Sequence, residues 1–179
     1  LGMIRSVGVY WKKGIVKAPL HFQLCLGVVG GMNAECADVE EMLAYIRRLQ
    51  LHGELPMEIT WSAFGVGKGH IPVMLSALAN GGNIRVGMED NVIYGKDEKG
   101  EKIFATNKML VERAVRIAKA ADKKIATPAE ARKILGLKEF KREEQLKELR
   151  AMKVEDFEAA KAGLREEFGG TYFEAKGMG

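Results

Sequence analysis

The feature that most constrains this fold is the regular alternation of short apolar stretches with longer amphipathic ones. Strand patterns occur at residues 21–26, 57–64 and 83–88, and helical patterns follow them at 34–51, 71–79 and 108–121. Repeated strand–helix units of these lengths predict a parallel sheet of the α/β class. Three units do not close a (β/α)8 barrel, which takes eight strands and about 250 residues.

Further helical patterns flank the three units. Met3, Ile4, Val7 and Trp11 recur at helical spacing, so the chain begins in a predicted helix. Thr127-Pro128 predicts the N-cap and first residue of another helix, which ends near Gly136. The near-continuous apolar end of the first strand, residues 21–26, indicates a strand covered on both faces.

The last part of the chain has a different composition. Residues 141–150 are dense in Glu and Lys, and Val154, Phe157, Ala160 and Leu164 recur at helical spacing. This pattern predicts one or two amphipathic helices that end in a loose terminus. The chain therefore divides into a predicted α/β part, residues 1–137, and a helical extension, residues 138–179.

Composition limits the classes of function. Of the 179 residues 47% are apolar and the net charge is +4, with basic residues scattered and not clustered as on nucleic-acid surfaces. A small basic excess fits an anionic small-molecule partner. No apolar run approaches the roughly 18 residues of a membrane span, and the pattern of a basic and then apolar signal segment does not occur, so we expect neither. Two cysteines form no disulfide framework or zinc motif, so we expect a cytoplasmic protein in a reducing compartment.

The end of the third predicted strand carries charge. In Asn83-Ile84-Arg85-Val86-Gly87-Met88-Glu89-Asp90-Asn91, apolar residues alternate with polar or small ones before a pair of acids. Ligands and catalytic groups collect at the carboxyl ends of parallel strands. Arg85, Glu89 and Asp90 are therefore candidate site residues. A solvated turn or a cap for the next helix is the alternative interpretation.

A glycine-rich run follows the second predicted strand. Gly65-Val66-Gly67-Lys68-Gly69 has G-x-G-x-G spacing and lacks both the dinucleotide-binding and the P-loop pattern. Its backbone N–H groups and the helix that follows could approach a phosphate. A purely structural tight turn is equally compatible with the pattern. Trp61 and His21 are interpreted as core residues, the histidine hydrogen-bonded, and Cys25 as a buried thiol.

Three motifs in order carry a resemblance to a known family. They are residues 19–27, PLHFQLCLG, residues 61–67, WSAFGVG, and residues 83–91, NIRVGMEDN. Together they resemble the β-keto acid cleavage enzymes, which include the 3-keto-5-aminohexanoate cleavage enzyme of lysine fermentation. The resemblance covers about residues 1–137 and fades beyond them. It implies the last three βα units of a TIM (β/α)8 barrel, preceded by part of the fifth helix, with five earlier strands outside this chain.

The resemblance also implies a site and a reaction. A zinc ion is held in the family by two histidines from an early strand and by a glutamate at the position of Glu89. Asp90 corresponds to the catalytic aspartate and Arg85 to the arginine that holds a carboxylate or an oxyanion. Gly65, Gly67, Lys68 and Gly69 would approach coenzyme A. The implied reaction condenses a β-keto acid with acetyl-CoA and gives acetoacetate and a new CoA ester.

Several alternatives stay open at this point. His21, His52 and His70 form no His-x-His pair, so we expect this chain alone to bind catalytic zinc poorly. Arg85 could instead belong to a buried ion pair. The resemblance and the apolar helix stripes imply a homo-oligomer, commonly a tetramer. A truncated or split fragment that acts as a non-catalytic binding or assembly module is the alternative function.

Overall fold

A computed structural model describes residues 1–137 and, beyond them, positions 143, 147 and 151. The chain divides into two units, Leu1–Leu137 and Lys138–Gly179. The helical extension predicted for the second unit falls almost entirely outside the described residues. All strands and helices named below belong to the first unit.

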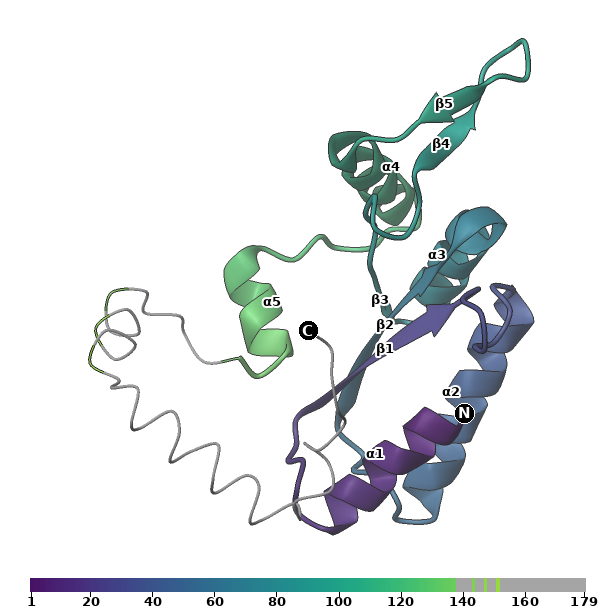
Figure 1. Cartoon of the computed structure of the whole chain (residues 1–179). Coiled ribbons are helices and arrows are strands. Elements are labelled where there is room, and N and C mark those ends of the chain that lie inside the picture. Colours follow the sequence, from purple (N-terminus) through teal and green to yellow (C-terminus); the bar gives the residue numbers. More distant parts are fainter. Residues whose placement is uncertain (138–142, 144–146, 148–150, 152–179) are drawn as a thin grey trace. The chain divides into compact units, whose positions relative to one another are not determined.

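A parallel sheet of three strands lies at the centre of the first unit (Figure 1). Its strands are β1, Leu20–Leu26, β2, Ile59–Gly65, and β3, Asn83–Ile84, in the order β1-β2-β3. β1 pairs with β2 along its whole length, from Leu20 opposite Ile59 to Leu26 opposite Gly65. The helices α1, Gly2–Lys12, α2, Cys36–Leu51, and α3, His70–Ala79, precede or connect these strands. The predicted α/β alternation is thus confirmed.

The core lies on one face of the sheet. In β1 burial alternates strictly, so that Leu20, Phe22, Leu24 and Leu26 are buried whereas His21 and Gln23 are exposed. The buried set packs against the apolar stripe of α2, namely Val39, Met42, Leu43, Ile46 and Leu49. Trp61 packs against the same cluster, as predicted. The prediction that β1 is covered on both faces was wrong for the described residues, because His21 and Gln23 on the opposite face are exposed.

The third strand is much shorter than predicted. β3 ends at Ile84, although the Arg85 N–H still donates to the Ala63 carbonyl at 3.3 Å. The chain then turns, and the Gly87 carbonyl accepts from the N–H groups of Asp90 and Asn91 at 3.2 and 3.1 Å. Glu89 therefore lies in a turn and not at the end of a strand. We call residues 87–91 the acid turn.

A two-stranded antiparallel hairpin follows the acid turn and was missed by the sequence patterns. It comprises β4, Ile93–Lys96, and β5, Lys102–Phe104. The polar segment 97–101 joins the two strands, and Asp97 Oδ1 accepts from the N–H groups of Lys99 and Glu101. The strands are too short to show a clear period of two, which explains why the pattern was not visible.

Two capped helices end the described unit. Thr106 Oγ1 accepts from the Met109 N–H at the start of α4, Asn107–Ala120. Thr127 and Glu130 form a capping box at α5, Pro128–Ile134, which confirms the predicted N-cap and the proline at N1. Within residues 1–137 every helix falls short of the length and apolar content needed to cross a membrane.

Candidate functional site

Three of the candidate residues meet at the carboxyl end of β3. Arg85 Nη2 lies 2.6 Å from Glu89 Oε2 and 3.3 Å from Asp90 Oδ1, and Nε lies 3.2 Å from Asp90 Oδ2. On its other side, Arg85 Nη1 donates to Gln23 Oε1 of β1 at 3.1 Å. One guanidinium therefore holds both acids of the acid turn and reaches across the sheet to the first strand.

The two acids differ in their surroundings. The side chain of Asp90 is 8% exposed, whereas that of Glu89 is 83% exposed. The Arg85 guanidinium also lies over the ring of Phe64, 4.5 Å from its centroid, a cation–π contact that limits its movement. The Arg85–Asp90 contact is thus an ion pair whose acid is buried, close to the alternative of a buried ion pair, whereas Glu89 is paired with Arg85 and open to solvent.

The face of the sheet opposite the core is polar. His21 lies on it, with Nδ1 2.8 Å from Thr60 Oγ1 and Nε2 3.0 Å from Ser62 Oγ. Burial lowers the pKa of His21. Both ring nitrogens are engaged, as expected of a hydrogen-bonded histidine, but the residue is exposed and not part of the core. His21, Gln23 and Arg85 border a cavity of about 490 Å³ on this face, which α5 also lines.

The glycine-rich run turns from β2 into α3 through a short 3-10 helix, Gly67–Gly69. Asn91 of the acid turn holds it: Asn91 Oδ1 accepts from the Gly67 N–H at 2.7 Å, and Asn91 Nδ2 donates to the Gly65 carbonyl at 2.9 Å. The Gly67 N–H is therefore satisfied within the chain. We call residues 65–69 the glycine loop.

Close packing explains two of the glycines in this loop. A Cβ on Gly69 would lie 2.0 Å from the Cβ of Ala34, and a Cβ on Gly65 would lie 2.5 Å from the Gly69 carbonyl oxygen. Gly67 has a φ of +66° with no atom within 4 Å of its added Cβ, a backbone conformation that favours glycine. The tight-turn interpretation therefore accounts for these three glycines.

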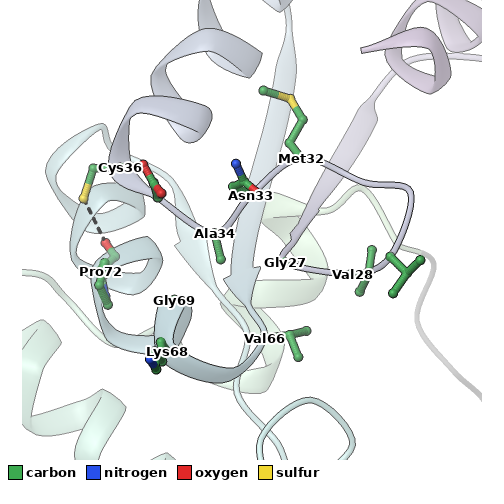
Figure 2. Close-up of a pocket in the computed structure, with 12 residues that line it drawn as sticks. Gly27, Val28, Met32, Asn33, Ala34, Cys36, Val66, Lys68, Gly69 and Pro72 are labelled. Carbon is green, nitrogen blue, oxygen red and sulfur yellow. Dashed lines mark hydrogen bonds between the residues drawn. The ribbon is translucent and has the colours of Figure 1, made fainter.

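A cavity of about 720 Å³ lies between the glycine loop and the loop that follows β1 (Figure 2). Figure 2 shows Val28, Met32 and Ala34 along the loop that follows β1, with Gly69 and Lys68 on the neighbouring segment and Gly69 next to Ala34. Cys36 borders the cavity as well, and its Sγ donates to the Pro72 carbonyl at 3.5 Å. Lys68 and Gly69 thus share a cavity, whereas Gly65 and Gly67 are not among the residues that line it.

Three polar residues of this region were given no role by the sequence analysis. Gln23 contacts Arg85, and Asn91 and His70 lie 2.7 Å apart behind the acid turn. Asn91 belongs to the motif at residues 83–91, but no local pattern distinguishes a buried asparagine from one in a solvated turn. The available signal was Gln23, a polar residue in the middle of an otherwise mostly apolar strand.

The described residues provide little to a metal ion. Within residues 1–137, no group of three His, Cys, Asp or Glu side chains converges closely enough to hold one. A catalytic zinc takes three protein ligands, and the acid turn offers one solvent-exposed carboxylate, Glu89, which is paired with Arg85. The residues in hand therefore do not form a zinc site by themselves.

Comparisons with known proteins agree with the motifs. A family model described as beta-keto acid cleavage enzyme matches residues 1–137. A 3-keto-5-aminohexanoate cleavage enzyme of Fusobacterium nucleatum is 39% identical over 137 residues, which are 76% of this chain and 45% of that protein. Its counterpart in Acetoanaerobium sticklandii is 36% identical over 126 residues, 70% of this chain and 41% of that protein.

A third relative is named for a different substrate. A 3-dehydrocarnitine:acetyl-CoA trimethylamine transferase of Rhizobium meliloti is 33% identical over 126 residues, 70% of this chain and 37% of that protein. The chain thus spans less than half the length of the curated relatives that it matches. Because the family match extends over the whole described α/β unit, this chain belongs to the beta-keto acid cleavage enzyme family.

Proposed function

We propose that this chain forms part of the active site of an enzyme that cleaves a β-keto acid with acetyl-CoA and yields acetoacetate and a new CoA ester. Relatives support the two substrate classes, since their names include a keto acid that is cleaved and an acetyl-CoA acceptor. In this proposal Arg85 binds an anionic oxygen, Asp90 accepts a proton, and Glu89 is one ligand of a metal ion.

The geometry around Arg85 fits those roles. A guanidinium presents paired donors that match a carboxylate. In this structure the N–H groups of Arg85 already donate to Gln23, Glu89 and Asp90, so a substrate anion would have to replace one of these acceptors. Exposed ion pairs contribute about 1 kcal/mol or less, so Glu89 can release Nη2 to an incoming anion at little cost. Asp90 is buried beside the same guanidinium, where its carboxylate is a suitable general base.

The zinc of the family fits this chain only in part. Glu89 could supply one oxygen ligand, and the remaining ligands of a zinc ion would have to come from residues outside 1–137. The steps that we propose for this chain's own residues therefore involve only Arg85 and Asp90. When bound, a zinc ion would act as a Lewis acid on the keto oxygen.

The 720 Å³ cavity is the proposed place for part of coenzyme A. Its apolar wall, Val28, Val29 and Met32, suits an aliphatic arm, and Lys68 at its border can pair with a phosphate. The cavity is formed by the loops after β1 and β2. In TIM barrels these carboxyl-end loops build the active site.

The convergence of Arg85, Glu89 and Asp90 within the family-matched segment is the observation that carries this proposal. We test it by assaying the purified protein for acetoacetate formed from acetyl-CoA and 3-keto-5-aminohexanoate. Asp90→Asn should lower kcat at least about 100-fold, because it removes the carboxylate base and leaves a side chain of nearly the same size and shape. Asp97→Asn in the hairpin turn is the matched control and should leave kcat unchanged.

Intact mass of the purified material decides between this proposal and the alternative. A species that carries further strands, joined to this chain or beside it, is required for catalysis. If the 179-residue chain is the only species and no keto acid named for the relatives is cleaved, the chain is a binding or assembly module. One observation favours that alternative, namely that the sheet of residues 1–137 has three strands and does not close.

An assembly of identical chains and a cytoplasmic location belong to the same proposal. Exposed apolar side chains on the hairpin and on α4, Ile93, Phe104 and Val111, support a subunit contact, and a tetramer is the state we propose. Light scattering after size-exclusion chromatography measures it. Both Cys25 and Cys36 are free thiols, which fits a reducing compartment.

A further inference from the structure

A buried asparagine connects the two candidate functional segments. Asn91 is 5% exposed and ends the acid turn. Its carboxamide makes three contacts, all with the segment that runs from the glycine loop into α3: the Gly65 carbonyl, the Gly67 N–H and His70 Nδ1. Both amide hydrogens and the amide oxygen are therefore used. This side chain is the direct hydrogen-bonded link between the acid turn and the glycine loop.

The contacts of Asn91 fix its orientation. Gly67 N–H can only donate, so it requires Oδ1, and the Gly65 carbonyl can only accept, so it requires Nδ2. Nδ2 then faces His70 Nδ1 at 2.7 Å as a donor. His70 must accept with an unprotonated Nδ1, and its proton must reside on Nε2.

The surroundings of His70 agree with a neutral ring. His70 is 6% exposed, and within residues 1–137 its Nε2 finds no hydrogen-bond partner. Burial is the main cause that lowers the pKa of His70; Arg113 on α4 lowers it further, and Asp90 in the acid turn opposes the shift. A charged ring would place a second donor against Asn91 Nδ2.

The acid turn has few other anchors. The Met88 N–H donates to Asn107 Oδ1 at 2.9 Å from the start of α4, and Arg85 pairs with the acids from the polar face. Neither contact reaches the glycine loop. Loss of Asn91 would leave the loop and the turn free to move independently.

We propose that Asn91 is a positioning residue whose side-chain hydrogen bonds hold the acid turn against the glycine loop, with neutral His70 as one acceptor. We call this set of hydrogen bonds the tie. Asn91 thereby sets the position of Asp90, its neighbour in sequence, relative to Lys68 and the 720 Å³ cavity. The effect on turnover rests on the proposed function, whereas the tie itself does not.

Nitrogen-15 NMR of His70 in the purified wild-type protein tests the tie without any assay. We expect a neutral ring at pH 7.5 with the proton on Nε2. A ring that is charged, or that carries its proton on Nδ1, would overturn the proposal.

Hydrogen exchange adds a second measurement: Asn91→Ala should speed exchange of the Gly67 amide about tenfold or more. An unchanged rate would also overturn it, and Asn80→Ala on the exposed end of α3 is the control.

Kinetics then test positioning. Asn91→Ala should raise the KM for acetyl-CoA and lower kcat together, about tenfold or more in kcat/KM, because both segments move. His70→Asn retains an acceptor near the position of Nδ1 and should keep most of kcat/KM, whereas His70→Leu should resemble Asn91→Ala. Equal losses in both His70 variants would overturn the proposal. An inactive wild-type protein with the expected His70 spectrum would count against the proposed function and not against the tie.

Discussion

Arg85 Nε lies 3.2 Å from Oδ2 of Asp90, and the Asp90 side chain is 8% exposed. Glu89 shares the same guanidinium at 2.6 Å but is 83% exposed. An ion pair with a buried member and one with an exposed member thus meet at a single arginine. The two should differ sharply in what they contribute to stability, because water can replace Arg85 around Glu89 and cannot do so around Asp90.

Arg85→Gln is expected to lower the free energy of unfolding by about 3 kcal/mol, since it leaves the Asp90 carboxylate buried without its counter-charge. Glu89→Gln should cost less than about 1 kcal/mol. Urea denaturation followed by circular dichroism measures both. Equal losses in the two variants would show that Asp90 is more hydrated than its burial indicates.

The two cysteines should differ in reactivity. Burial raises the pKa of the Cys25 thiol, the Asp90 carboxylate raises it further, and Arg85 partly offsets this shift. Cys36 is exposed at the border of the 720 Å³ cavity. Because the thiolate is the reactive form, iodoacetamide should label Cys36 first, as peptide mass spectrometry can determine.

The same reagent tests the proposed coenzyme A site. Desulfo-coenzyme A, which has no thiol to consume the reagent, should slow labelling of Cys36 severalfold and leave Cys25 unaffected. Lys68→Ala should weaken this protection, since a phosphate would lose its counter-charge. Unchanged labelling of Cys36 at saturating ligand would remove the cavity from the proposed site.

Stability should decline as the solution becomes mildly acidic. Burial lowers the pKa of both His21 and His70 below the ordinary value of 6.5. The unfolded chain then binds protons before the folded one, so their contribution is fully present above pH 6.5 and is lost as the pH falls below it. Urea midpoints at pH 8.0 and 5.5 measure the decline. In a His21→Gln, His70→Asn double variant the urea midpoint should fall less between pH 8.0 and 5.5 than in the wild-type protein. An equal fall would show that these two histidines do not cause the decline.

Two glycines of the glycine loop should respond differently to alanine. Gly67→Ala places a side chain in open space at a φ of +66° and should cost about 1 kcal/mol. Gly69→Ala drives a methyl group into Ala34 and its carbonyl, so it should cost about 3 kcal/mol or more. Thermal unfolding compares them. Adding Ala34→Gly to Gly69→Ala should restore part of the lost thermal stability, because it removes the methyl group that the new side chain meets. No recovery would show that the contact with the Ala34 Cβ does not cause the loss.

Local patterns predicted most of the elements of residues 1–137. The helix that starts at Pro128 was placed by its cap residues, and α2 was placed by its apolar stripe, because both signals depend on residues within a few positions of each other. The length of β3 and the hairpin at 93–104 were not predicted. A turn stabilised by the Gly87 carbonyl and the Asn107 side chain leaves no period in the sequence.

The sequence by itself determined the family, the order of strands and helices, and the choice of Arg85, Glu89 and Asp90 as candidates. Only the tertiary structure decided that Arg85 holds both acids, that Glu89 is exposed and Asp90 buried, and that Asn91 joins the acid turn to the glycine loop. The physical reason is separation along the chain. Asn91 meets Gly65 across 26 positions, and such a contact depends on the pairing of β2 with β3 and on the packing of α3 beside β2.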